Sequence, residues 1–301
     1  SGTTGHPKGA LYHHRSTVLH AMGVAMPDVF NLSRAASVLP IVPQFHACAW
    51  GLPYAAAAAG SKLVMPGPRL DPEGLTELLE GEFDIEFRHG WGMTETSPLG
   101  SVNTLLPSHR EWPVEERSAF QTKQGRAPYG IELRIVGQDG EILPHDGHAF
   151  GELQVRGPWV VDGYFRSDEA KLTDDGWFPT GDVATIDSDA YVQITDRTKD
   201  LIKSGGEWIS SIDVENTAMG HADIAMAAVI GIPDEKWGER PLLIAVPAAD
   251  TQPTKKAVLE YLSSSLAKWQ LPDDVIFVES LPMGATGKVQ KTKLREEYAG
   301  N

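Results

Sequence analysis

Ser1-Gly2-Thr3-Thr4-Gly5-His6-Pro7-Lys8-Gly9, the stretch that opens the chain, has the composition of a phosphate-binding loop. Its three glycines let backbone N–H groups turn inward, its three hydroxyl side chains add donors, and Lys8 adds a positive charge. A Walker P-loop needs Gly-Lys-Ser/Thr after a four-residue spacer, so this loop is of another kind. Taken alone, the stretch is equally compatible with a flexible linker.

Further short segments complete a pattern with this loop. In chain order they are Phe45-His46-Ala47, Gly90-Trp91-Gly92-Met93-Thr94-Glu95, Thr180-Gly181-Asp182, Asp196-Arg197-Thr198-Lys199-Asp200 and Gly287-Lys288. Each segment alone is a weak signal, whereas all of them in one order form a specific pattern. The pattern resembles the adenylate-forming, AMP-binding superfamily. Within it, the chain is most similar to acyl-CoA synthetases, namely medium- and long-chain fatty-acyl-CoA ligases and 3-methylmercaptopropionyl-CoA ligases.

Bulk composition agrees with an intracellular enzyme. A chain of 301 residues exceeds the usual single domain, so two domains are expected. The formal charge of −15 argues against a surface for nucleic acid or anionic membrane. A single cysteine, Cys48, excludes an intrachain disulfide and suits the cytoplasm. We expect no membrane span, because the longest apolar stretch, Trp50 to Ala59, is short and contains Gly51 and Pro53.

Hydrophobic patterning predicts an α/β fold in two parts. Short alternating strands between Ile131 and Thr195 indicate a barrel-like or meander region, and an α+β pattern follows Arg197. The resemblance implies a large N-terminal adenylation domain, built from α/β sheets and a distorted β-barrel, and a small mobile α+β C-terminal domain. We place these domains at residues 1–196 and 197–301. The expected elements are helices at 12–26, 50–59, 75–79 and 255–266, and strands at 36–42, 62–65, 131–136, 151–156, 183–186, 191–195, 225–230, 242–246 and 275–278.

The N-terminal part departs from the family pattern. In similar proteins several dozen residues separate the helix ending near Leu79 from the Gly-Trp-Gly-Met-Thr-Glu turn, but here Glu80 to Asp84 lead almost directly to it. The portion that normally precedes the phosphate loop is also absent. We expect that residues are missing from the sequence near 80–84, because both sides of the junction read as intact family sequence. The alternative is a true deletion, which would abolish activity.

The resemblance implies a two-step reaction. A carboxylate attacks the α-phosphate of ATP and releases pyrophosphate, and the thiol of CoA then displaces AMP from the acyl-adenylate. Both steps need negative charges neutralised at defined positions, because phosphoryl and nucleotidyl transfer depend mainly on positioning and electrostatics. The expected cofactors and substrates are therefore ATP, Mg²⁺, CoA and a carboxylic acid.

Catalytic residues follow from the resemblance. Lys288 matches the lysine that bridges the substrate carboxylate and the α-phosphate, whereas Lys291 and Lys293 nearby are interpreted as solvated surface lysines. Glu95 matches the carboxylate that binds Mg²⁺, which takes few protein oxygens when phosphate supplies the rest. Thr94 beside it matches a phosphate contact. Thr94 and Glu95 could instead be a helix-capping pair.

ATP-binding residues are implied in the same way. The loop residues, together with the Gly-Trp-Gly turn, match phosphate and adenine contacts, with Trp91 stacked on or beside the base; an isolated tryptophan is more often a core residue. Asp182 matches the acceptor of both ribose hydroxyls. Arg197 matches a ribose or phosphate contact, with a structural Asp-Arg turn as the alternative. The full set is Ser1, Gly2, Thr3, Thr4, Gly5, Lys8, Gly90, Trp91, Gly92, Asp182 and Arg197.

The remaining positions concern the second step and the acyl group. Lys199 matches the hinge about which the C-terminal domain rotates. The segment Gly205-Gly206-Glu207-Trp208 matches the lining of the CoA tunnel, where glycine leaves room for pantetheine; it also reads as a β-turn between strands. His46 matches the residue between acyl pocket and thiol tunnel, and Trp50 a wall of that pocket. An isolated histidine such as His46 is also often only a core residue.

The sequence therefore predicts an AMP-forming carboxylic acid:CoA ligase acting on a fatty acid or a 3-methylmercaptopropionate-like acid. One alternative is an adenylating enzyme that loads a carrier protein. Another is an inactive fragment that serves as a binding module. The expected partners are small molecules and not nucleic acid, and a homodimer is compatible with the prediction. No zinc-type Cys/His spacing is present, and no metal role is implied for His13, His14 or His20.

Overall fold

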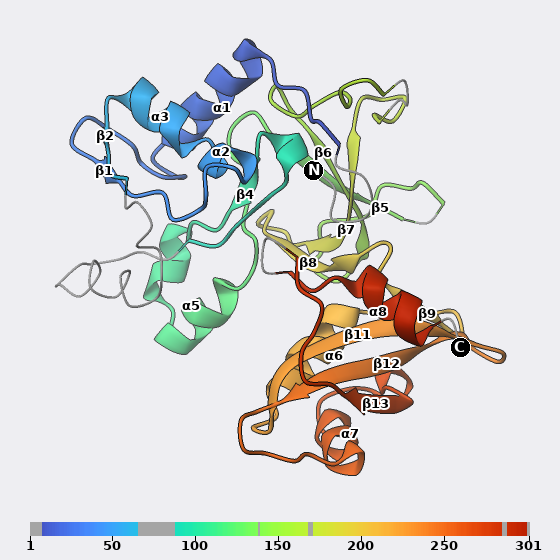
Figure 1. The fold of residues 1–301 in the computed structure, drawn as a ribbon. Coiled ribbons are helices and arrows are strands. Elements are labelled where there is room, and N and C mark those ends of the chain that lie inside the picture. The colour runs from blue at the N-terminus through green and yellow to red at the C-terminus, as the bar shows by residue number, and fades with distance from the viewer. Residues whose placement is uncertain (1–7, 66–87, 138, 168–170, 285–287, 300–301) are drawn as a thin grey trace. The chain divides into compact units, whose positions relative to one another are not determined.

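The computed structural model describes residues 8–65, 88–137, 139–167, 171–284 and 288–299 (Figure 1). The predicted loop residues Ser1, Gly2, Thr3, Thr4 and Gly5, the helix at 75–79 and the junction near 80–84 lie outside the described residues. Contacts divide the chain into two compact units. The first comprises residues within 8–180 and 184–194, and the second comprises 181–183 and residues from Thr195 onward. Within the described residues, no helix is long and apolar enough to cross a membrane.

The first unit begins with a pair of packed helices. Its α1 helix (His14–Ala25) packs against α3 (Leu52–Ala59) through buried Ala21, Val24 and Ala55. The α3 helix starts with Pro53 in its first turn and stops at Gly60, which has a φ of +72°. Beside the pair, β1 (Ser37–Val38) is parallel to β2 (Lys62–Leu63). Both strands are shorter than predicted, since pairing in this two-stranded sheet covers only two residues of each.

A hairpin and a short helical segment follow. The β3 strand (Gly90–Gly92) is antiparallel to β4 (Leu99–Val102), with the 3-10 turn η1 (Thr94–Thr96) between them. Next come η2 (Pro107–Glu111) and α5 (Val114–Phe120), which the sequence patterns did not predict. Four aromatic rings join this segment to the sheet that follows, namely His109, Trp112, Phe120 and Tyr191, with centroids of His109 and Trp112 4.3 Å apart.

The predicted meander is a four-stranded sheet in the order β5-β6-β7-β8. Its strands are β5 (Glu132–Val136), β6 (Phe150–Arg156), β7 (Phe178–Ile186) and β8 (Val192–Arg197). The predicted hairpin at 137–140 is present, because Val136 bridges Ile142 beyond the turn. Buried Ile135, Leu153 and Ala184 make the core beneath the sheet.

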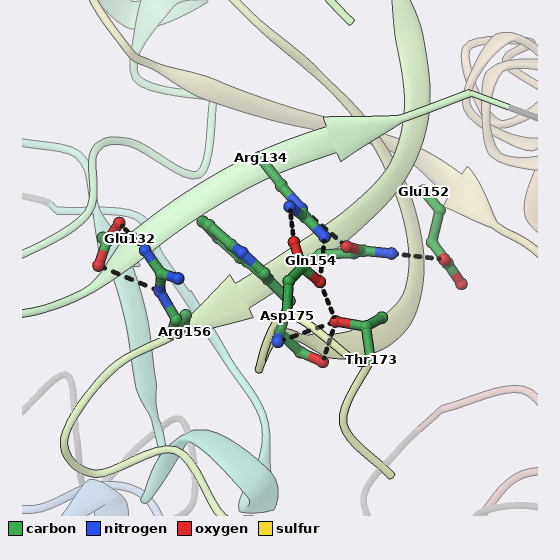
Figure 2. A network of polar contacts seen from close by, with 8 residues as sticks. Glu132, Arg134, Glu152, Gln154, Arg156, Thr173 and Asp175 are labelled. Carbon is green, nitrogen blue, oxygen red and sulfur yellow. Dashed lines mark hydrogen bonds and ion pairs between the residues drawn. The ribbon is translucent and has the colours of Figure 1, made fainter. Parts of the chain in front are cut away.

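A polar network covers one face of β5 and β6 (Figure 2). Arg134 donates to both carboxylate oxygens of Asp175, at 2.6 and 3.1 Å, and to Gln154. This pairing lowers the pKa of Asp175 to about 2. Arg134 and Arg156 also lie 4.4 and 4.5 Å from the centroid of the Trp177 ring. The network thereby ties the 173–177 segment to the sheet.

The second unit is an α+β fold around two long central strands. Its sheet has the order β10-β9-β12-β11, with β13 beside β12. The elements are β9 (Ile202–Ser204), β10 (Glu207–Ile209), α6 (Ser211–Met219), β11 (Ile224–Asp234), β12 (Gly238–Pro247), α7 (Lys255–Ser263), η3 (Lys268–Gln270), β13 (Asp274–Phe277) and α8 (Lys291–Tyr298).

Two apolar layers explain the continuous hydrophobic runs in β11 and β12. Alternate residues of a strand point to opposite faces, so Val229 packs with α6 and α7 while Ile230 packs with Leu294 of α8. Side-chain caps start two of the helices: Ser210 accepts from the Asp213 N–H in α6, and Thr254 accepts from the Ala257 N–H in α7. The helices α6 and α8 were not predicted, because their apolar residues recur with a weaker helical period than those of α7.

Candidate active site

The described end of the phosphate loop is held by a neighbouring segment. Gly9 accepts a 2.7 Å hydrogen bond from the N–H of Phe165, and Ala10 forms an antiparallel bridge with Tyr164. The ammonium of Lys8 lies 5.2 Å from the centroid of the Tyr164 ring. Tyr164 therefore sits directly beside the cation that the sequence assigns to phosphate.

The predicted metal ligand, Glu95, meets the same tyrosine. Glu95 lies in η1, is 1% exposed, and accepts a 2.6 Å hydrogen bond from the Tyr164 hydroxyl to its Oε1 atom. Its carbonyl accepts from the N–H of Val161 at 2.9 Å, and the carbonyl of Thr94 accepts from the Tyr12 hydroxyl at 2.6 Å. The structure thus brings Lys8, Thr94 and Glu95 together through two tyrosines.

Tyr12 and Tyr164 were not among the residues predicted from the sequence. Each follows a glycine-containing segment, but no local pattern distinguishes them from packing aromatics. Burial raises the pKa of Tyr12, and the nearby Cys48, Glu95 and Tyr54 raise it further. Cys48 belongs to the turn that follows His46.

That turn has an unusual backbone. Residues 47–50 all have φ between +46° and +57°, and Gly51 continues at +69°. A left-handed residue other than glycine costs roughly 1–2 kcal/mol, and such strain concentrates at functional segments. His46 is half-buried at its start, and Trp50 packs against the α1–α3 cluster. The helix predicted from Trp50 therefore starts at Leu52, after this turn.

Close packing of the neighbouring backbone leaves little room for side chains at the two glycines of the Gly-Trp-Gly turn. A Cβ atom on Gly92 would lie 1.8 Å from the carbonyl oxygen of Pro98, and one on Gly90 would lie 3.3 Å from that of Ser101. Trp91 is 8% exposed and packs in the core beneath the β5–β8 sheet, with its ring over Gly100. The structure thus shows the packing role of Trp91, while its contact with adenine stays a prediction.

The donor set fits magnesium only together with nucleotide phosphates. Among the residues that the structure describes, no group of three or more His, Cys, Asp or Glu side chains could hold a metal ion. Mg²⁺ is commonly bound by one or two carboxylates, water and substrate phosphates. Glu95 is buried next to Thr94 and is hydrogen-bonded to the tyrosine whose ring lies beside Lys8, so it suits the role of the single carboxylate.

Asp182 and Arg197 lie on neighbouring strands of the sheet, β7 and β8. The Arg197 Nε and Asp182 Oδ1 atoms are 3.4 Å apart, and the side chains are 38% and 13% exposed, respectively. The Thr198 N–H donates to the carbonyl of Gly181 at 2.9 Å, which joins the two turns. The structure therefore brings together the two residues predicted at the ribose.

The predicted hinge segment is tied to the helices of the second unit. The carboxylate of Asp200 lies 2.5 Å from Arg295 in α8, and burial lowers the pKa of Lys199. Asp196 is buried and accepts from the N–H and hydroxyl of Ser211, at 2.5 and 3.1 Å. Burial raises the pKa of Asp196.

The structure corrects one prediction near Lys288. Lys291 is no solvated surface lysine: its side chain is 13% exposed, and its Nζ atom lies 2.7 Å from Glu215 Oε1 and 2.6 Å from Ser211 Oγ. Its partner Glu215 lies 76 positions earlier in the chain and its side chain is 14% exposed. Sequence patterns near Lys291 therefore could not predict this ion pair. Lys288 and Lys293 are exposed.

The predicted CoA segment is a tight hairpin between β9 and β10. Gly205 and Gly206, with φ of +61° and +89°, form its two-residue turn, and Glu207 pairs with Ser204. A Cβ atom on Gly205 would lie 2.6 Å from the Trp237 ring, whereas one on Gly206 would meet nothing within 4 Å. The ammonium of Lys203 lies 4.9 Å from the Trp208 ring centroid.

Two family models match the chain. Residues 1–82 and 72–165 match the family model described as AMP-binding enzyme, and residues 213–288 match the AMP-binding enzyme C-terminal domain. The two pieces of the first match overlap at residues 72–82, at the junction expected near 80–84.

Similar curated proteins are CoA ligases. The chain is 45% identical to 3-methylmercaptopropionyl-CoA ligase of Ruegeria lacuscaerulensis, over 99% of this chain and 65% of that protein. It is 46% identical to the medium-chain-fatty-acid–CoA ligase of Ectopseudomonas oleovorans, over 99% of this chain and 64% of that protein. The chain thus spans slightly less than two thirds of the length of these relatives.

Solved structures show the same fold. ATP-bound MatB from Rhodopseudomonas palustris matches with a TM-score of 0.85 and 25% identity, over 100% of this chain and 67% of that chain. O-succinylbenzoate CoA synthetase of Bacillus subtilis, in complex with its acyl-adenylate intermediate, matches with a TM-score of 0.81. The predicted fold class is confirmed.

Proposed function

Because this chain belongs to the AMP-binding enzyme family, we propose that the protein is an AMP-forming ligase that joins a carboxylic acid to CoA through an acyl-adenylate. The observation that carries the proposal is the pair of tyrosines at this site: Tyr164 contacts a phosphate-loop cation and the buried carboxylate of Glu95, and Tyr12 contacts the carbonyl of Thr94. The names of the similar curated proteins support the same activity.

In the first step, an oxygen of the substrate carboxylate attacks the α-phosphorus of ATP, and the bond to the β-phosphate breaks to release pyrophosphate. Lys8 attracts the phosphates, Thr94 contacts them, and Asp182 accepts hydrogen bonds from the ribose hydroxyls. Lys288 offsets the negative charge of both the carboxylate and the α-phosphate. When bound at Glu95, Mg²⁺ would neutralise phosphate charge.

In the second step, the CoA sulfur attacks the acyl carbonyl and the bond to AMP breaks. The Gly205–Gly206 hairpin supports CoA as acceptor, since side chains are absent at its tip. For the acid we propose a fatty acid or a 3-methylmercaptopropionate-like acid, from the names of the relatives.

The proposed use of ATP and CoA, together with the single cysteine, supports a cytoplasmic location for the protein.

The test is acid-dependent exchange of pyrophosphate into ATP, followed by addition of free CoA. The protein is first mass-mapped across Gly81 to Asp84, so that any residues missing from the sequence are found. Exchange that needs a carboxylic acid, followed by acyl-CoA formation, supports the proposal. Exchange without acyl-CoA formation would favour transfer to a carrier protein, and no exchange in the verified protein would favour an inactive binding module.

A further inference from the structure

A buried polar chain links three separate segments of the second unit. The Nζ atom of Lys291 contacts Glu215 at 2.7 Å and Ser211 at 2.6 Å, and Ser211 donates to Asp196. Glu215 also accepts from the Val229 N–H at 2.7 Å. The chain therefore runs from the first residue of α8, across α6, to the residue before Arg197.

Lys291 is placed where its charge is unfavourable without this pairing. It is the first residue of α8, and a cation near a helix N-terminus is opposed by the helix dipole. Asp196 is buried and the Glu215 side chain is 14% exposed, and loss of solvent raises the pKa of each. Lys291 offsets both effects, so the ammonium is held in one place by groups from distant parts of the sequence.

The same lysine closes the stem of the Lys288 loop. The carbonyl of Lys288 accepts a 2.7 Å hydrogen bond from the Gly284 N–H, and Met283 bridges Val289. Gln290 N–H donates to the carbonyl of Pro282 at 2.8 Å. Lys291 is the next residue after Gln290 and the first residue of α8. Its ion pair with Glu215 therefore fixes the position at which the stem joins α8.

We infer that Lys291 is a positioning residue for Lys288: its contacts with Glu215 and Ser211 anchor the stem that carries Lys288, the lysine proposed to meet the reacting carboxylate. The inference rests on the proposed function and adds a residue to it. Adenylation depends on placement within about 1 Å, and misplacement can cost on the order of 100-fold in rate.

The experiment measures acid-dependent ATP–pyrophosphate exchange in variants of the verified protein. We expect Lys291→Met to lower the kcat of exchange on the order of 100-fold, and Lys291→Arg to recover much of it, because a guanidinium can still pair with Glu215. Lys293→Met removes a charge from the exposed face of the same helix and is the matched control. It should change exchange by less than about twofold.

Two combinations separate positioning from a structural role. In a Lys288→Ala background, Lys291→Met should add no further loss, because the group it positions is gone. Lys291→Met with Glu215→Gln removes both members of the ion pair while Asp196 stays charged, and it should recover part of the melting temperature lost in Lys291→Met without recovering exchange.

Losses that multiply in the Lys288→Ala background, or exchange that returns together with the melting temperature, would overturn the inference. Equal losses of exchange in Lys293→Met and Lys291→Met would overturn it as well. A wild-type protein with no acid-dependent exchange would instead refute the proposed function, and the inference with it.

Discussion

The hydroxyl of Tyr164 donates a 2.6 Å hydrogen bond to the Oε1 atom of Glu95, although the two residues are 69 positions apart. Glu95 is 1% exposed, so this bond compensates a carboxylate that is removed from water. The ring of the same tyrosine lies beside Lys8. One side chain thus orients a carboxylate and lies beside a cation, both assigned to the phosphates of ATP.

Tyr164→Phe keeps the ring but removes this hydrogen bond. We expect the Mg²⁺ concentration needed for half-maximal exchange to rise roughly 10- to 100-fold, because partners that orient a metal-binding group typically contribute that much. Binding of Mg·ATP measured by calorimetry should weaken in parallel. Tyr129→Phe is the control, since Tyr129 is 82% exposed. An unchanged Mg²⁺ dependence in Tyr164→Phe would contradict the role given to Glu95.

Lys288→Ala should separate the two half-reactions. We expect adenylation to fall by on the order of 10² to 10³-fold, since a cation that stabilises transition-state charge is lost. The thioester half-reaction from preformed acyl-adenylate should change only slightly, because the α-phosphate bond is already made. Rapid-quench measurement of each half-reaction checks this, and equal losses in both would count against the assignment of Lys288.

Gly205→Ala and Gly206→Ala form a matched pair for the CoA hairpin. Both carry positive φ, so each alanine should cost roughly 1–2 kcal/mol of unfolding free energy. Only Gly205→Ala also presses on Trp237, so it should be the less stable variant by urea denaturation and should raise the KM for CoA more. Adenylation should be the same in both. A larger KM effect in Gly206→Ala would argue against a role for the Trp237 ring.

His20 predicts a pH dependence of stability. Burial lowers its pKa to about 4, and its Nε2 atom accepts from the Leu99 N–H. The contribution is fully present above the unfolded pKa of about 6.5. As pH falls toward 4, only the unfolded chain binds the proton, so up to roughly 3 kcal/mol is lost.

The check is chemical denaturation between pH 7 and 4. His20→Gln should show a shallower decline than the wild type, because the titrating group is removed. His145→Gln, at an exposed position, should keep the wild-type slope. Parallel curves for wild type and His20→Gln would show that the pKa of His20 is the same in the folded and unfolded chains, contrary to this prediction.

Local chemistry accounts for what could be predicted before the structure. The motifs that carry charge and glycine, such as Thr180-Gly181-Asp182, are contiguous, so their order identified the family. Alternating hydrophobicity located β6, and continuous apolar runs located β11 and β12, because burial on one face or on both leaves a regular trace. The short helices α6 and α8 have a weaker periodic pattern of apolar residues than α7, which was predicted.

Chain order and residue type thus established the fold class, the family and the residue types expected at an ATP site. Tertiary structure added the partners: Tyr12 and Tyr164 at Thr94 and Glu95, and Glu215 beneath Lys291. These contacts join residues 69 to 82 positions apart, for which sequence spacing carries no signal. Whether a lysine faces water or a buried carboxylate depends on which distant segments pack against it, and that is decided only when the chain has folded.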